Sequence, residues 1–141
     1  MPPAPTDSLC RMARYLHTMV RVTDPARSRE FYEALGFTFS REMDIVRNGE
    51  LEATNYFFSV GDTPDVLELT FNHDGRSYEL GTAYGHVAIE VPDVKKACER
   101  VKSQGGKITR EPGPVKGGTT VIAFAEDPDG YKIEFIERKP R

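Results

Sequence analysis

Apolar and polar residues alternate along several short stretches of the chain. Over residues 15–22 one face is mostly apolar, and the opposite face carries His17 and Arg21. The same period of two recurs over residues 65–72, where Glu68 lies on the polar face. Because successive side chains of a strand point to opposite faces, both stretches are predicted to be strands with one buried face.

Two aspartates are each followed by apolar residues at helical spacing. After Asp24 the apolar positions recur at intervals of three and four, and the pattern stops at Gly36. After Asp93 an apolar stripe ends in the same way before Gly105. An aspartate before the first turn and a glycine after the last turn are typical helix boundaries, so each segment is predicted to be an amphipathic helix.

The order strand, aspartate, helix, glycine therefore occurs twice in the same register. A separation of 69 residues relates His17 to His86, Asp24 to Asp93, and Gly36 to Gly105. Such a repeat indicates a supersecondary unit that is present in two copies. We expect an α+β fold with two βαβββ modules, over residues 14–80 and 81–141, that form a cupped mixed sheet with the helices outside. Residues 1–13 are expected to be a disordered leader.

Three further strands are expected in each copy. They are predicted over residues 37–41, 53–60 and 65–72 in the first copy, and over residues 107–110, 119–125 and 131–137 in the second. Residues 43–52 are polar and contain Asn48-Gly49, so we interpret them as a connection with a turn. Asp127 to Gly130 is a second predicted turn, with proline at its second position.

Composition excludes several classes of partner. The chain has 141 residues, a net charge of −3 and a pI near 5.6, which argues against binding to nucleic acid or to an anionic membrane. No apolar run approaches the ~20 residues of a membrane span, and the first residues lack a signal-peptide pattern. We therefore expect a cytoplasmic protein, in which Cys10 and Cys98 are free thiols and Cys98 is buried.

The polar strand faces carry candidate metal ligands. The first copy offers His17 on its first strand and Glu68 on its last, and the second copy offers His86 and Glu134 at matching places. Taken singly, such a histidine is more often structural and such a glutamate more often solvated. Two matched pairs favour a site for one divalent first-row metal ion, because imidazoles and carboxylates bind nickel, zinc, iron or cobalt. His73 has no counterpart in the other copy and is interpreted as a loop residue.

Six segments carry a resemblance to a known family. They are residues 16–22 (LHTMVRV), 31–37 (FYEALGF), 66–72 (VLELTFN), 78–89 (YELGTAYGHVAI), 109–124 (TREPGPVKGGTTVIAF) and 126–137 (EDPDGYKIEFIE). Together they resemble glyoxalase I, the lactoylglutathione lyase, in its short bacterial form within the vicinal oxygen chelate superfamily. The resemblance extends from Tyr15 to Glu137.

The resemblance implies a metal-dependent lyase. It places the metal ion on His17, Glu68, His86 and Glu134, with Ni²⁺ favoured and Zn²⁺ as the alternative, between two subunits of a homodimer. The implied substrate is the hemithioacetal of methylglyoxal and glutathione, which is isomerised to S-lactoylglutathione through an enediolate. The implied glutathione-binding residues are Arg21, Asn72, Arg110 and Lys116.

The chemistry expected from such a site is a proton transfer between neighbouring carbons. A metal ion beside the two substrate oxygens stabilises the enediolate as a Lewis acid. A carboxylate then removes the proton and returns it to the adjacent carbon. Glu134 is the expected principal base, and Glu68 is the alternative for the opposite face.

Two segments depart from the family pattern, namely residues 43–58 and the stretch after Asn72. Both leave another low-molecular-weight thiol as an alternative to glutathione. Other reactions on this fold also stay open: an epimerase acting beside a thioester, a thiol transferase opening an epoxide, or an extradiol dioxygenase, which uses three protein ligands. A non-enzymatic sequestering protein is a further alternative, and it would hold no stoichiometric metal.

Overall fold

The two expected βαβββ modules are present in the computed structural model, which describes residues 12–140. The first module consists of β1 (Thr18–Arg21), α2 (Pro25–Ala34), β2 (Phe37–Arg47), β3 (Glu50–Val60) and β4 (Thr63–Asn72). The second consists of β5 (His86–Val91), α3 (Val94–Ser103), β6 (Lys107–Pro114), β7 (Val121–Glu126) and β8 (Lys132–Glu137). The prediction of the element order from the 69-residue repeat is therefore confirmed.

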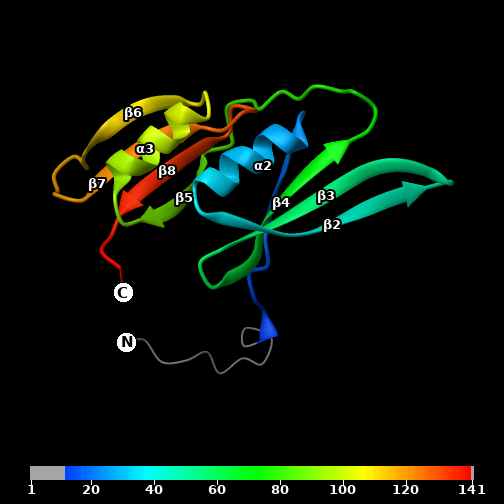
Figure 1. Cartoon of the computed structure of the whole chain (residues 1–141), viewed down its shortest axis with the longest axis horizontal. Helices are drawn as coiled ribbons and strands as arrows, with labels where there is room; N and C mark the ends of the chain where they lie inside the picture. Colours follow the sequence, from blue (N-terminus) through cyan, green and yellow to red (C-terminus); the bar gives the residue numbers. More distant parts are fainter. Residues whose placement is uncertain (1–11, 141) are drawn as a thin grey trace.

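Each module forms its own four-stranded mixed sheet (Figure 1). The strand order is β1-β4-β3-β2 in the first sheet and β5-β8-β7-β6 in the second. In both sheets the first strand runs parallel to the last strand, and the other neighbours are antiparallel. The parallel pair joins the two ends of a module, so residues that are far apart in the sequence become neighbours.

The predicted helix boundaries are confirmed. The Asp24 side chain accepts a hydrogen bond from the Arg27 amide at 3.2 Å, and the Asp93 side chain accepts one from the Lys96 amide at 3.0 Å. Each bond satisfies an amide that the first turn of a helix leaves without a partner. Gly36 and Gly105 follow the two helices with φ of 98° and 74°, a conformation that glycine adopts without strain.

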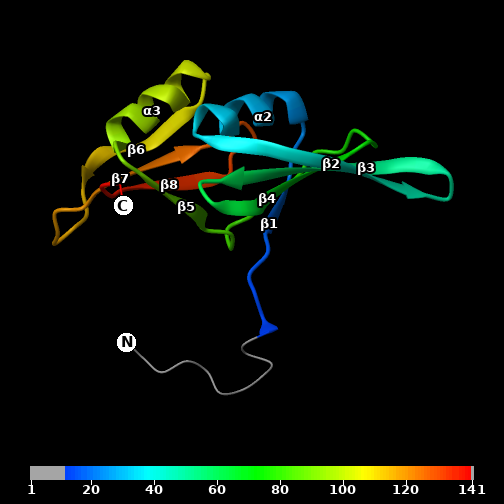
Figure 2. The same ribbon diagram turned by 60° about the horizontal axis from the view of Figure 1, so that its bottom comes forward.

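Both helices lie side by side over one side of the two sheets (Figure 2). Phe31 and Tyr32 of α2 and Val94 and Val101 of α3 are at most 2% exposed and belong to one hydrophobic cluster. That cluster also includes the apolar faces of the strands beneath the helices. No helix formed by residues 12–140 covers the opposite faces of the two sheets, and these faces carry the polar residues singled out above.

The turn between β7 and β8 ties the second module to the first. The Tyr32 hydroxyl donates a hydrogen bond of 2.6 Å to Asp127, and Asp129 accepts bonds of 3.0 and 2.7 Å from the amide and the hydroxyl of Thr23. Asp127 is only 4% exposed, and burial raises the pKa of its carboxyl to about 6. These bonds join Thr23, just before α2, and Tyr32, in the last turn of α2, to the predicted turn at residues 127–130.

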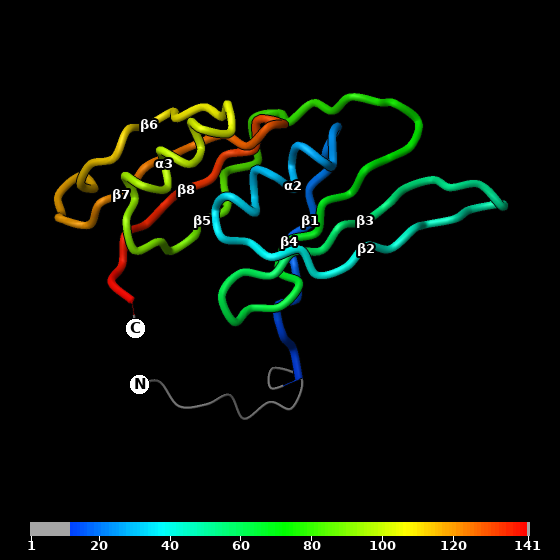
Figure 3. The backbone as a smooth tube through the Cα atoms, viewed as in Figure 1, coloured from blue at the N-terminus to red at the C-terminus, as the bar shows by residue number. Residues whose placement is uncertain are grey.

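The prediction for residues 43–52 is wrong in one respect. These residues are not a connection, because β2 continues to Arg47 and β3 begins at Glu50. Only Asn48-Gly49 turns, and both residues have positive φ, as a two-residue hairpin turn requires. The hairpin projects beyond the rest of the first sheet (Figure 3). Its two strands are linked by polar contacts such as the 3.0 Å Arg47–Glu52 ion pair. The sequence of the hairpin therefore lacks the alternation of apolar and polar residues that would have predicted strands.

Other expectations concern the chain ends and the thiols. Cys10 lies outside the described residues, as do residues 1–11 of the expected leader. Cys98 is a free, buried thiol as predicted, and burial raises its pKa. Within residues 12–140, no helix is long and apolar enough to cross a membrane.

Candidate metal and substrate site

The first His–Glu pair arises from the parallel pairing of β1 and β4. His17 immediately precedes β1, and Glu68 lies in the middle of β4, opposite Met19. Nε2 of His17 lies 3.8 Å from Oε1 of Glu68. The two side chains are 36% and 12% exposed, so the pair is accessible from the uncovered face of the first sheet.

The second sheet repeats this arrangement. His86 is the first residue of β5, and Glu134 lies on the parallel neighbour β8. Nε2 of His86 lies 3.1 Å from Oε1 of Glu134. The structure therefore joins each predicted histidine to the glutamate of its own copy.

Each pair also contains a phenylalanine that the sequence reasoning missed. Phe57 is opposite Glu68 on β3 and meets the His17 ring edge-on with centroids 5.9 Å apart. Phe124 is opposite Glu134 on β7 and meets the His86 ring in the same way at 5.2 Å. Such contacts fix the plane of an imidazole and shield one side of it. The separation of 67 residues between the phenylalanines, close to that of the histidines, was a usable signal.

The two pairs do not converge within one chain. Among residues 12–140 there is no group of three or more histidine, cysteine, aspartate or glutamate side chains placed to hold a metal ion. The second pair has the spacing of two ligands of one metal ion, since two ligands about 2.1 Å from a cation and at right angles to each other lie about 3.0 Å apart. The 3.1 Å separation of His86 and Glu134 matches this value closely.

Two of the four predicted thiol-binding residues lie beyond the first pair. Asn72 ends β4 on the same face as Glu68, and Arg21 ends β1 opposite Thr70. The Asn72 amide donates a hydrogen bond of 2.6 Å to the Tyr78 hydroxyl, which orients its carboxamide. The structure therefore brings Arg21 and Asn72 to the same end of the uncovered face.

Arg110 and Lys116 belong to the second sheet. Arg110 lines a pocket of about 400 Å³ together with His86. Its guanidinium donates hydrogen bonds of 3.1, 2.9 and 2.9 Å to the carbonyl oxygens of Gly113, Ile122 and Pro114. Lys116 lies in the loop that these bonds hold, between β6 and β7. In the structure Arg110 thus braces the loop, and its contact with a thiol stays a prediction.

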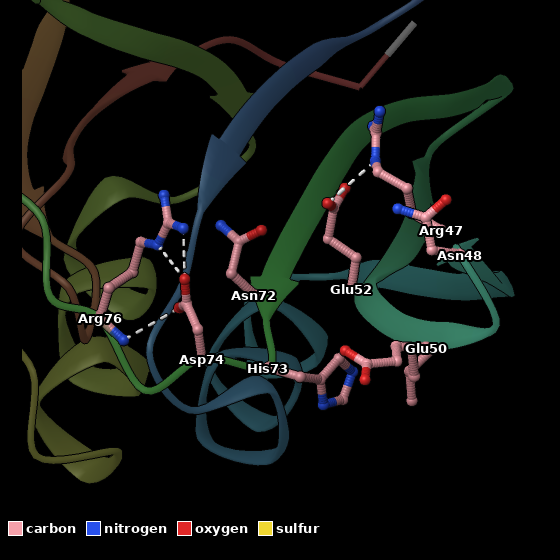
Figure 4. A pocket seen from close by; sticks show the side chains of 9 residues that line it. Arg47, Asn48, Glu50, Glu52, Asn72, His73, Asp74 and Arg76 are labelled. Carbon is pink, nitrogen blue, oxygen red and sulfur yellow. Dashed lines mark hydrogen bonds and ion pairs between the residues drawn. The ribbon is translucent and has the colours of Figure 1, made fainter.

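Another cavity lies elsewhere, at the end of the β2–β3 hairpin (Figure 4). It encloses about 580 Å³ and is lined by Asn72 and His73, but by neither His–Glu pair. Its two arginines, Arg47 and Arg76, are held by carboxylates of Glu52 and Asp74. His73 follows β4 and lines this cavity, as expected for a loop residue, and its Nε2 is hydrogen-bonded to the Thr54 hydroxyl at 2.8 Å.

Comparison with known proteins identifies relatives that match most of the described region. The model of the Glyoxalase/Bleomycin resistance protein/Dioxygenase superfamily matches residues 14–135. A lactoylglutathione lyase of Neisseria meningitidis is 55% identical over 129 residues, which cover 89% of this chain and 91% of that protein. The lactoylglutathione lyase of Escherichia coli O157:H7 is 52% identical over 89% of this chain and 93% of its own length.

A solved structure shares the same fold. The crystal structure of glyoxalase I from Zea mays superposes with a TM-score of 0.80 at 48% identity, over 90% of this chain. The chain spans about half the length of the maize protein, since the match covers 45% of it. It spans nearly the full length of the two bacterial relatives.

Proposed function

The chain belongs to the lactoylglutathione lyases of the Glyoxalase/Bleomycin resistance protein/Dioxygenase superfamily, and from this we propose that it isomerises the hemithioacetal of methylglyoxal and glutathione to S-lactoylglutathione. The observation that carries the proposal is the pair of matched His–Glu half-sites. They lie on uncovered sheet faces, with Nε2–Oε1 separations of 3.8 and 3.1 Å. A sequestering protein needs no such set of four ligands.

The complete site is proposed to form between two subunits of a homodimer. Each subunit would contribute His17 and Glu68 to one site and His86 and Glu134 to the other. Two observations support this arrangement: within residues 12–140 the pairs stay apart, and apolar side chains are exposed beside the first pair. Leu16, which precedes His17, and Met19, which is opposite Glu68, are 61% and 36% exposed. Exposed apolar residues of this kind are typical of a surface that a partner covers.

The four residues fit a divalent metal ion by their chemistry. Two carboxylates balance the charge of a dication, and two neutral imidazoles complete a ligand set that leaves room for substrate oxygens. Ni²⁺ is favoured by the resemblance to short bacterial forms, and Zn²⁺ is the alternative. When bound, the ion supplies a Lewis acid beside the two oxygens of the hemithioacetal.

The remaining chemistry falls to side chains of the chain itself. The Glu134 carboxylate is proposed to accept the proton from C1 of the hemithioacetal and to deliver it to C2. Glu68 occupies the equivalent position in the other half-site and would act on the opposite face. Arg21 and Asn72 are proposed to hold a carboxylate of the thiol, because a guanidinium and a carboxamide both donate to anionic oxygens.

The test is metal removal followed by single-metal reconstitution. The purified protein is treated with a chelator, and isomerisation of the methylglyoxal–glutathione hemithioacetal is then measured after adding Ni²⁺, Zn²⁺ or Co²⁺ alone. We expect activity to return best with Ni²⁺. Return with Zn²⁺ alone would keep the function and correct the metal. Stoichiometric metal binding without turnover would overturn the proposed reaction and point to another thiol or to an epimerase.

A cytoplasmic location completes the proposal. Glutathione is abundant and keeps thiols reduced in that compartment. The free thiol of Cys98 is compatible with such conditions.

A further inference from the structure

The uncovered face of the first sheet carries a polar residue that the proposed site does not use. Asn55 lies on β3 directly opposite Thr70 of β4, and Thr70 is opposite Arg21 of β1. The three residues form a row across the sheet, two positions along β4 from Glu68. Asn55 is only 5% exposed, although it lies on the face that no helix covers.

A hydrogen bond fixes the orientation of the Asn55 carboxamide. The Thr70 hydroxyl donates to Oδ1 of Asn55 at 2.8 Å. The amide nitrogen makes no hydrogen bond with the described part of the chain. Since no buried side-chain nitrogen or oxygen in that part lacks a partner, this nitrogen reaches the surface of the sheet face. Asn55 therefore presents two unused N–H donors.

The neighbouring side chains are donors as well. Adjacent strands lie about 4.8 Å apart, so Arg21 and Asn55 stand on either side of Thr70 with their Cα atoms roughly 10 Å apart. Asn72 lies two residues further along β4, roughly 7 Å from Thr70. A guanidinium and two carboxamides therefore stand near one another on one face of three neighbouring strands. Groups of this kind suit an anionic oxygen group.

We propose that Asn55 is a specificity-determining residue that donates a hydrogen bond to a carboxylate of the thiol cosubstrate, from the side opposite Arg21. This inference rests on the proposed function and adds a requirement to it. The thiol must carry a carboxylate that reaches over Thr70, roughly 7 Å along the strand from Glu68. A thiol without such a group would lose this contact.

The test replaces the donors and keeps the acceptor. Asn55→Asp preserves the shape and the bond from the Thr70 hydroxyl, but it removes both N–H groups and adds a repelling charge. Asn55→Ser removes both amide N–H groups without adding a charge and leaves only a shorter hydroxyl. We expect KM for the hemithioacetal to rise about 10- to 100-fold in the aspartate variant and about 10-fold in the serine variant. In both variants, kcat and bound metal per chain should stay within about twofold of wild type.

Thr70→Val is the matched control for a structural role. It breaks the same hydrogen bond but leaves the amide donors in place, so its KM should rise less than that of Asn55→Asp. If Asn55 served only to hold Thr70, the aspartate variant would behave as wild type and the valine variant would show the defect. That result would overturn the inference.

Ligand binding separates this inference from the proposed function. Dissociation constants of S-methylglutathione and of its diethyl ester are measured for wild type and Asn55→Asp by calorimetry. The substitution should weaken binding of the free acid and leave the affinity for the ester unchanged. Equal weakening of both ligands, or of neither, in a wild type that isomerises the hemithioacetal would refute the Asn55 contact alone. A wild type that neither isomerises nor binds S-methylglutathione would refute the proposed function.

Discussion

The shared site predicts that two inactive variants restore each other's activity. Glu68→Gln damages the half-site on the first sheet, and Glu134→Gln damages the half-site on the second. Each glutamine is isosteric with glutamate but is neutral and a weaker ligand. If each site combines the first sheet of one subunit with the second sheet of its partner, each homodimer of a single variant has both sites damaged. We therefore expect each variant alone to lose at least about 100-fold in kcat.

The heterodimer of the two variants has a different composition. One of its sites collects both substitutions, and the other collects none. In a random mixture about half of the dimers are mixed, and half of the sites in those dimers are intact, so activity should return to about a quarter of wild type. A purified heterodimer should reach about half of wild type.

The assay uses two affinity tags and co-expression, so that the mixed dimer can be isolated in two steps. The control pairs Glu68→Gln with His17→Ala, which damage the same half-site. In that heterodimer both sites contain a substitution, and no activity should return. A Glu68→Gln/Glu134→Gln heterodimer as inactive as this control would refute the shared site, and the four ligands would then have to meet within one chain.

Three further predictions concern stability and the β6–β7 loop. The folded-state pKa of Asp127 is about 6 against 3.8 for the free group, so its contribution to stability is complete below pH 3.8 and is lost as the pH rises through 6. Between pH values below 3.8 and above 6, the free energy of unfolding should fall by about 3 kcal/mol. Urea titrations of Asp127→Asn at the same pH values should not show this fall. A Cβ on Gly106 would lie 2.7 Å from Cγ1 and 3.0 Å from the carbonyl oxygen of Val101, so Gly106→Ala should lower the unfolding free energy by about 1–3 kcal/mol in the same assay. Gly85→Ala, with nothing within 4 Å of the added carbon, is its control, and equal losses would contradict the steric argument. Arg110→Lys keeps the charge but lacks the planar guanidinium, whose two terminal nitrogens together reach three carbonyl oxygens. Hydrogen exchange over residues 112–120 should therefore accelerate about tenfold by mass spectrometry. Unchanged exchange would show that these bonds do not hold the loop.

The sequence was sufficient for the parts of the fold that local chemistry dictates. Asp24 and Asp93 cap their helices because the carboxylate binds an amide two or three positions ahead, and that pattern is visible in the chain. The repeat supplied the rest of the module order. The long β2–β3 hairpin was not predictable from apolar alternation, since its outer part has no helix to pack on and its strands are joined by polar contacts such as Arg47–Glu52.

The sequence predicted which side chains of a strand share a sheet face, but not which residues of neighbouring strands lie opposite each other. His17 and Glu68 could be assigned to one face because side chains alternate along a strand. The place of Asn55 could not, because it depends on the register between β3 and β4, which sets Asn55 opposite Thr70. A shift of that register by one residue would move the side chain to the helix-covered face. The separation of Phe57 and Phe124 could have paired them in the sequence, but their contacts with the histidines depend on the pairing between strands.

The topology of the module is the reason for proposing a site shared by two chains. Parallel pairing of the first and last strands places a histidine beside a glutamate in each sheet, so one module makes half a site. Two half-sites form a complete one only if their uncovered faces meet. Within a chain, the helices share one hydrophobic cluster and Asp127 and Asp129 hold the modules side by side, with both helices over the same side (Figure 2). The uncovered faces of one chain therefore point to a common side, and a second chain related by a twofold axis can present its complementary half-site to each of them.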